Sequence, residues 1–158
     1  MSVNLPPFQA LLQEHRADVY RFLVATAGHS EADDAFQETW IAALRAYPRL
    51  RRADNLRAWL FRIAQNKSID AHRARGRRAV PVAAVPESAS PPPPEHGDPA
   101  VWGSLRGLPA KQRTAGFCRS VLGMPYDELA ALLESSEEAA RRNVHEGLKR
   151  MREELEDD

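Results

Sequence analysis

Cysteine is almost absent from this sequence of 158 residues, in which Cys118 is the one thiol. A single cysteine cannot form an internal disulfide, and the simplest environment for such a chain is a reducing cytoplasm. The five histidines do not show the one-turn spacing of a histidine pair that binds zinc. We therefore expect neither a metal site nor any other cofactor.

Long apolar runs are missing as well. No segment approaches the roughly 18 consecutive apolar residues that a membrane-spanning helix needs. The first residues, MSVNLPPFQALLQEHRAD, lack the charged start, apolar stretch and cleavage site of a signal peptide. These absences predict a cytoplasmic chain that does not insert into a membrane.

The chain has no net charge, because it contains 22 basic and 22 acidic residues. These charges are, however, unevenly distributed along the sequence. Residues 41–80 carry eleven basic and two acidic side chains, a net charge of +9. The flanking segments are acidic, with −4 over residues 1–40 and −3 over residues 81–98. A concentrated positive field of this kind attracts polyanions such as nucleic acid, although a solvated helix face has the same composition.

Proline is concentrated in one place, the segment VPVAAVPESASPPPPEHGDPA at residues 80–100. Seven prolines there exclude a helix, because proline lacks the backbone donor and clashes with the preceding turn. We interpret residues 79–98 as a flexible linker between two small domains, residues 1–78 and 99–158. Helical periodicity on both sides, without any competing strand pattern, predicts an all-α fold.

Several local signals predict where the helices lie. One helix is expected over residues 5–27, and the next is expected to be capped by Ser30 and to end near Tyr47, with Ile41 and Leu44 available for packing. A third follows Asp54 or Asn55. Beyond the linker we expect helices over about 109–123 and 126–133, and then a longer one capped by Ser135 or Ser136. Ser135 and Glu138 have the spacing of a capping box.

The third helix, with the sequence WLFRIAQNKSIDAHRARGRR, combines two faces. At about 100° per residue, an apolar face is formed by Leu56, Leu60, Ile63, Ala64, Ala71 and Ala74. An adjacent stripe contains Trp59, Arg62, Asn66, Asp70, Arg73 and Arg77. Cations neutralise phosphates, an amide can pair with a base edge, and an aromatic ring can stack on an exposed base. The stripe therefore suits nucleic acid, although core packing for Trp59 and an ion pair with Arg73 for Asp70 are the simpler interpretations.

The last two helices, within MPYDELAALLESSEEAARRNVHEGLKRM, have the form of a helix-turn-helix. In that motif the second helix enters the major groove, and its first residues reach the bases. One face of this helix presents Glu138, Arg141, Arg142, His145 and Lys149. The other is expected to be buried and contains Ala140, Val144, Leu148, Met151 and Leu155. Helical hairpins also occur in proteins that never bind DNA, so the motif alone leaves the function open.

The two halves together resemble a known family. The segment ADDAFQETWIAALRAY, followed by NLRAWLFRIAQNKSIDAHRARGRR, resembles region 2 of bacterial RNA polymerase sigma factors. The C-terminal segment, from LPAKQR through the helix-turn-helix, resembles their region 4. A linker without region 3 is the layout of the extracytoplasmic-function (ECF) subgroup of the sigma-70 family. The resemblance implies a region 2 helical bundle joined to a region 4 helix-turn-helix, and a subunit that binds polymerase core and directs promoter-specific initiation without catalysis of its own.

The resemblance also implies roles for individual residues. It assigns docking on the β′ clamp helices of RNA polymerase to Asp34, Gln37, Glu38 and Trp40. It assigns recognition and melting of the minus-10 element to the third helix and the loop before it, with Arg49, Arg51, Arg52, Trp59, Arg62, Asn66, Lys67, Arg73 and Arg77. It assigns the minus-35 element to Glu138, Arg141, Arg142, His145 and Lys149. Further partners that it implies are the β flap of the polymerase and an anti-sigma factor.

Two other functions remain open at this level. One is a DNA-binding regulator that uses the helix-turn-helix without joining polymerase. The other is a nuclease, in which Asp33, Asp34 and Glu38 would hold magnesium. The docking motif argues against the first, and the absence of a second set of ligands or of a glycine-rich phosphate loop argues against the second.

Overall fold

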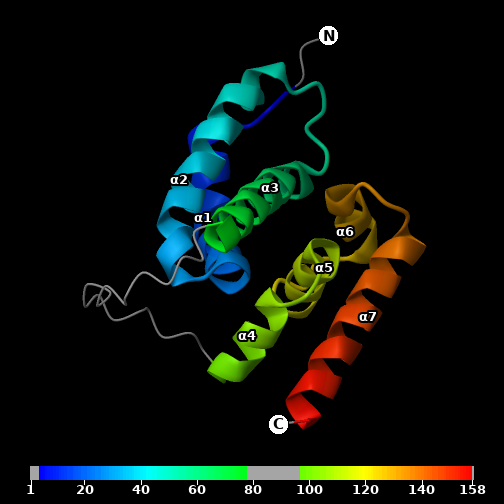
Figure 1. Cartoon of the computed structure of the whole chain (residues 1–158). Helices are drawn as coiled ribbons and strands as arrows, with labels where there is room; N and C mark the ends of the chain where they lie inside the picture. Colours follow the sequence, from blue (N-terminus) through cyan, green and yellow to red (C-terminus); the bar gives the residue numbers. More distant parts are fainter. Residues whose placement is uncertain (1–3, 78–96, 158) are drawn as a thin grey trace.

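The structure is a computed structural model that describes residues 4–77 and 97–157, and within them all regular structure is helical, as the sequence predicts (Figure 1). The N-terminal helices pack side by side, and the C-terminal helices lie against α3 and α1 (Figure 1). None of the helices in this part of the chain is long and apolar enough to cross a membrane. The elements in chain order are α1 Phe8–Ala27, α2 His29–Ala46, a 3-10 turn Tyr47–Arg49, α3 Leu56–Arg77, α4 Pro99–Arg106, α5 Ala110–Ser120, α6 Tyr126–Leu133 and α7 Glu137–Glu156.

The core of the N-terminal bundle lies between α1 and α3. Phe22 and Phe61 are fully buried and meet edge to face, with ring centroids 5.6 Å apart. A buried hydroxyl pair joins the same two helices, because Ser68 Oγ donates to Thr26 Oγ1 at 2.8 Å and Thr26 Oγ1 donates to the Phe22 carbonyl at 2.7 Å. This satisfies both buried hydroxyl groups and fixes the axial position of α3 on α1.

The buried face of α3 differs from the one that the sequence predicts. Leu60 and Ala64 are buried as expected, and Ala58, Phe61 and Ser68 are buried too. The other predicted members, Leu56, Ile63, Ala71 and Ala74, are only half-buried. The prediction placed one apolar face on α3, whereas the helix packs against α1, α2 and α6. A helix with neighbours on several sides buries residues outside one 100° stripe.

The connection between α1 and α2 depends on Gly28. Its φ of 90° and ψ of 159° form a backbone conformation that is essentially restricted to glycine. Gly28 both ends α1 and precedes the first residue of α2, His29. The prediction that Ser30 caps α2 is therefore wrong, because the glycine starts the helix before Ser30.

The C-terminal helices begin with α4, an element that the sequence analysis missed. The side chain of Asp98 accepts a hydrogen bond from the Ala100 amide at 2.9 Å, and Pro99 is the first helical residue. An aspartate cap followed by proline is a typical helix start. The helix therefore begins directly after the predicted linker, whose last residue, Asp98, is its cap. Most of that predicted linker, residues 79–96, lies outside the described residues.

The helix-turn-helix consists of α6 and α7, joined by a turn in which Glu134 adopts a left-handed conformation with φ 54°. Ser136 caps α7, since its Oγ accepts from the Ala139 amide at 3.1 Å. The predicted capping box of Ser135 with Glu138 is wrong. With Ser136 as the cap, Glu138 is the second helical residue rather than the third.

The buried face of α7 also differs from the prediction at two positions. Ala140, Val144 and Met151 are buried as expected, but Leu148 is 36% exposed and Leu155 is half-buried, while Gly147 is buried instead. A Cβ atom at Gly147 would lie 3.2 Å from the Gln112 carbonyl oxygen of α5. The missing side chain therefore lets α5 approach α7 closely.

Candidate functional site: three surfaces on α2, α3 and α7

The outer face of α2 forms one exposed stripe. Asp34, Gln37, Ile41 and Leu44 are all exposed and follow one another at three- and four-residue spacing, so they share a face. The expectation that Ile41 and Leu44 pack in the core is wrong, since they are 49% and 56% exposed. The buried face of α2 is formed by Ala32, Ala35, Thr39, Trp40 and Ala43.

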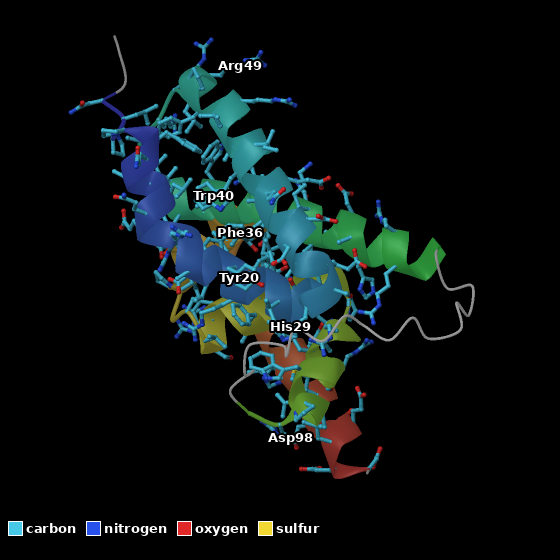
Figure 2. The ribbon with its side chains drawn as sticks, turned by 90° about the vertical axis from the view of Figure 1, so that its left-hand side faces the viewer. Tyr20, His29, Phe36, Trp40, Arg49 and Asp98 are labelled. Carbon is cyan, nitrogen blue, oxygen red and sulfur yellow. The ribbon has the colours of Figure 1, made fainter. Side chains whose placement is uncertain are left out.

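Trp40 lies beneath this stripe. It is 7% exposed and contacts Phe8 and Phe36 edge to face, with centroid distances of 5.9 and 6.1 Å. Figure 2 shows Tyr20, Phe36 and Trp40 in succession along the seam of α1 and α2. The side chain predicted to touch polymerase is thus an inner support of the surface rather than its outermost residue.

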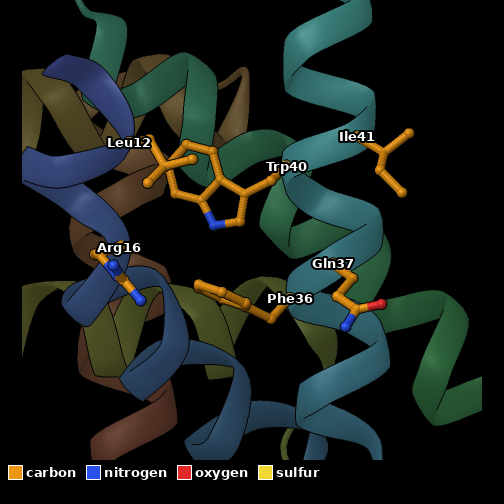
Figure 3. A pocket seen from close by; sticks show the side chains of 6 residues that line it. All are labelled: Leu12, Arg16, Phe36, Gln37, Trp40 and Ile41. Atoms are coloured by element: carbon orange, nitrogen blue, oxygen red, sulfur yellow. The ribbon is translucent and has the colours of Figure 1, made fainter. Parts of the chain in front are cut away.

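An open pocket of about 390 Å³ lies next to the stripe, between α1 and α2 (Figure 3). Apolar side chains dominate its lining. The lining residues are Leu12, Arg16, Phe36, Gln37, Trp40 and Ile41. An apolar hollow beside exposed Ile41 and Leu44, with carboxylates at the other end of the helix, is typical of a protein-binding surface.

The loop before α3 and the first turns of the helix form the second surface. Arg49, Arg51 and Arg52 are exposed, as a phosphate-binding loop requires. Trp59 is only partly exposed and packs on Tyr47, with centroids 6.1 Å apart. Tyr47 itself donates a hydrogen bond to the Pro6 carbonyl, which fixes the ring against which Trp59 leans.

The residues predicted to form the basic surface of α3 differ in their exposure and contacts. Asn66 and Arg73 are exposed and Lys67 is half-buried, whereas the side chain of Arg77 lies outside the described residues. The Arg62 guanidinium donates to the carbonyls of Ala131 and Leu132 at the end of α6. Arg62 is therefore already engaged within the chain.

The third surface is the exposed face of α7, and it matches the prediction in full. Glu138, Arg141, Arg142, His145 and Lys149 are all exposed. The guanidinium of Arg141 lies over the ring of Tyr126, 4.2 Å from its centre, and Arg119 lies 4.1 Å from the same centre. Arg119 also donates to the Met124 carbonyl at 3.1 Å. Tyr126 thus holds Arg141 near the start of α7, where a recognition helix meets bases.

The carboxylates on α2 do not form a metal centre. Asp33 accepts a hydrogen bond from the Tyr20 hydroxyl at 2.9 Å, so it faces α1. No group of three or more histidine, cysteine, aspartate or glutamate side chains that could hold a metal occurs within residues 4–77 and 97–157.

Two features of the site escaped sequence reasoning. One is the Tyr126 ring beneath Arg141, which the pattern of one helix cannot reveal. The other is an ion pair between α3 and α6, in which Arg57 donates to both carboxylate oxygens of Glu128, at 2.6 Å for Nη2 to Oε2. These partners are 71 residues apart. No local spacing signal connects residues so distant.

The fold and these surfaces define an all-helical protein with a helix-turn-helix, a basic helix and an amphipathic helix whose exposed face carries both carboxylates and apolar side chains. Comparison with known proteins identifies the family. Residues 11–78 match the family model described as Sigma-70 region 2. The chain is 37% identical over 159 residues to the "ECF RNA polymerase sigma factor SigD" of Mycobacterium tuberculosis, covering 92% of this chain and 75% of the relative. It is 28% identical to the "RNA polymerase sigma factor CarQ" of Myxococcus xanthus over 92% of this chain and 87% of the relative.

Solved structures agree with this result. The sigma factor RpoE from Bartonella quintana, solved in complex with the anti-sigma factor NepR, superposes with a TM-score of 0.73 at 26% identity, covering 96% of this chain and 98% of that chain. CnrH, solved in complex with the cytosolic domain of CnrY, has the same fold, with a TM-score of 0.72 at 24% identity over 96% and 88% of the two chains. The chain belongs to the ECF family of sigma factors, which are transcription initiation factors.

Proposed function

We propose that this ECF sigma factor docks on the core of RNA polymerase through the outer face of α2, captures the minus-10 element with α3 and contacts the minus-35 element with α7. The chain acts in the cytoplasm as a specificity subunit and performs no catalysis of its own. The observation that carries the proposal is the separation of three exposed surfaces of different chemistry on three helices of one fold.

The α2 surface supports the polymerase-binding role through its composition. Asp34, Gln37 and Glu38 supply acceptors for a basic partner, and exposed Ile41 and Leu44 supply apolar contact area on the same side of the helix. Trp40 and Phe36 stiffen the helix from below. The clamp helices of β′ form a coiled coil, a partner shape that suits one long exposed helix face. Exposed carboxylates also favour a partner of opposite charge.

The α3 and α7 surfaces divide DNA recognition. The exposed arginines before α3, together with Asn66, Lys67 and Arg73, offer phosphate and base contacts to a melted strand. Opening the duplex and displacing a base costs a few kcal/mol, least at A·T steps. The α7 face presents Arg141 and Arg142 in its first two turns, the part of a recognition helix that reaches bases in the major groove. An anti-sigma factor is a further partner, in keeping with the complex in which the Bartonella relative was solved.

The docking surface can be tested by measuring the affinity of the full chain for bacterial core polymerase. Asp34→Ala combined with Gln37→Ala removes one carboxylate and one amide from the α2 stripe. We expect binding to weaken about tenfold, as loss of about 1.4 kcal/mol from two polar contacts implies. The measurement is an equilibrium titration of labelled chain with core enzyme.

A matched control removes the same two kinds of side chain elsewhere. Gln13→Ala with Glu14→Ala acts on exposed residues of α1 and is expected to leave core affinity unchanged. Equal affinities for both double variants and the unmodified chain would show that α2 is not the docking surface. A chain that binds promoter DNA but not core at all would instead be a helix-turn-helix regulator.

A further inference from the structure

The α2 stripe carries the two most exposed large apolar side chains among the described residues. Ile41 is 49% exposed and Leu44 is 56% exposed. Leaving such side chains in water is unfavourable, and a contact that covers them is stabilised by the apolar area it buries. When polymerase is absent this face is therefore available to another partner, and the charges of α2 indicate which one.

These charges are separated along the helix. All carboxylates of α2 precede Ile41, and its one arginine, Arg45, follows Ile41. The carboxylates are those of Glu31, Asp33, Asp34 and Glu38. Two parallel copies of the helix would place like charges opposite one another, whereas two antiparallel copies place the carboxylates of each opposite the arginine of the other. The face is thus complementary to itself under a two-fold axis, in which the same surface serves both copies.

The positions around Ile41 give the register of such a pair. At about 100° per residue, Glu38 and Arg45 lie about 60° and 40° from Ile41, on the same side of the helix. Glu38 stands three residues before Ile41 and Arg45 stands four residues after it, and both are exposed. A two-fold axis beside Ile41 therefore brings Glu38 of each copy next to Arg45 of the other.

The opposite side of Ile41 leads to the pocket between α1 and α2. Gln37 and Leu44 lie on this side, about 40° and 60° from Ile41. Gln37 lines the pocket of about 390 Å³, and Figure 3 shows Phe36 and Trp40 directed from α2 toward α1. The same two-fold axis places Leu44 of one copy opposite Gln37 of the other. An aliphatic side chain thus reaches the mouth of an apolar pocket.

From these features we propose that two copies of the free chain pair through antiparallel α2 helices. Leu44 of each copy enters the pocket of the other, and Glu38 and Arg45 form reciprocal ion pairs. The pair covers the α2 stripe and so competes with polymerase core, a consequence that rests on the proposed function. One helix face is small beside the roughly 800 Å² per partner of stable complexes, so we expect a dissociation constant of about 10 μM.

Charge reversals in the full chain, without polymerase, test the register. Glu38→Arg alone places arginine against arginine, and Arg45→Glu alone places carboxylate against carboxylate. Each variant is expected to self-associate about tenfold more weakly than the unmodified chain, because the two-fold axis repeats every altered contact. An equimolar mixture of the two variants restores both contacts between opposite charges. The mixture is therefore expected to form heterodimers with nearly the affinity of the unmodified chain.

The measurement is sedimentation velocity in low-salt buffer between about 1 and 300 μM chain, a range that brackets the expected dissociation constant. A dimer has twice the chain mass of 17.7 kDa. Glu153→Arg and Arg152→Glu make the same charge changes on the exposed end of α7 and are the matched controls, with unchanged self-association. Circular dichroism checks that each variant keeps its helices.

Leu44→Ser tests the pocket in the same assay. Loss of the aliphatic side chain from both copies is expected to weaken pairing at least about tenfold. Val121→Ser is the matched control, because Val121 is a 39% exposed apolar residue outside α2. Its dissociation constant is expected to equal that of the unmodified chain.

Two results would overturn the proposal, an unmodified chain that stays monomeric throughout the range, and a mixture of the reversed variants that associates no better than each variant alone. Equal association of Leu44→Ser and Val121→Ser would remove the pocket from the interface. Core polymerase is then added to the fluorescently labelled dimer and is expected to dissociate it. Binding of core to an intact dimer would show that the pair leaves the docking surface open. Pairing as described in a chain that never binds core would leave the dimer standing and reject the proposed function instead.

Discussion

Asn66 gives the most direct test of α3 at the scale of a single residue. It is exposed and lies one turn beyond Arg62, so its removal leaves the contacts with α6 in place. An asparagine paired with a base is worth about 1–3 kcal/mol. We expect Asn66→Ala to reduce the fraction of open promoter complexes about tenfold, as measured by permanganate footprinting. Core affinity, measured on the same variant, is expected to be unchanged, and normal promoter melting would reject the assignment.

Tyr126 tests how α7 presents its arginines. Its ring carries Arg141 at 4.2 Å, and a cation over an aromatic ring at an exposed site contributes about 0.5–1 kcal/mol. Tyr126→Leu is expected to weaken binding of sigma-loaded polymerase to a promoter with an intact minus-35 element about two- to fivefold. Tyr126→Phe keeps the ring and is the matched control, with expected affinity equal to that of the unmodified chain. Equal affinities for all three proteins would mean that the ring does not position Arg141.

His15 makes stability depend on pH in a defined direction. It is 9% exposed, and burial, with a contribution from the positive charge of Arg57, lowers its pKa below the ordinary 6.5 despite nearby Glu14 and Glu128. Below pH 6.5 the unfolded chain therefore binds a proton that the folded chain accepts less readily, so stability is lost as the pH falls through 6.5 toward the lowered value. Urea unfolding at pH 7.5 and 5.5 should show a smaller decline for His15→Gln than for the unmodified chain. An identical decline would exclude His15 as the cause.

At the scale of the element, Gly28 tests the joint between α1 and α2. Residues with a side chain rarely adopt the backbone conformation of Gly28, so a substitution there is strained. An added Cβ would also lie 3.1 Å from a guanidinium nitrogen of Arg75. Gly28→Ala is expected to lower the free energy of unfolding by about 1–3 kcal/mol. Gly103→Ala is the matched control, because Gly103 is helical and exposed with open space around its Cβ position. The alanine there should be neutral or stabilise by about 0.5–1 kcal/mol, and equal stabilities of the two variants would contradict this account.

At the scale of the elements, apolar periodicity and capping signals predict most, but not all, of the helices and their buried faces. The all-α class, α1, α3 and the α6–α7 pair follow from apolar spacing, and the exposed face of α7 is as predicted. The errors occur where two signals compete. Asp98 and Pro99 start α4, but the prolines before them hid this helix start at the end of the predicted linker. Ile41 and Leu44 were expected to be available for packing because they are apolar, although the structure places them on the outer face of α2. That error is informative, since exposed apolar residues are what a docking surface needs.

The whole molecule contains information that its local patterns cannot show. The sequence predicts two separate domains and a basic stripe on α3 that is open to DNA. The exposure of Asn66 and Arg73 agrees with the prediction of an open stripe. The contact of α6 with α3 depends on pairs such as Arg57 and Glu128, which are distant in sequence and ordinary as surface charges. Their pairing follows only from the packing of α5 and α6 against α1 and α3. The contact of α6 with α3 is therefore a property of the tertiary structure, whereas the three exposed surfaces are properties of single helices.

The central claim is that this chain gives RNA polymerase its choice of promoter. The most direct measurement is transcription from fragmented genomic DNA of the source bacterium by bacterial core polymerase, with and without the chain. The account predicts new, discrete transcript starts that share upstream elements near −10 and −35. An unchanged transcript profile, with no binding of the chain to the core enzyme, would contradict it.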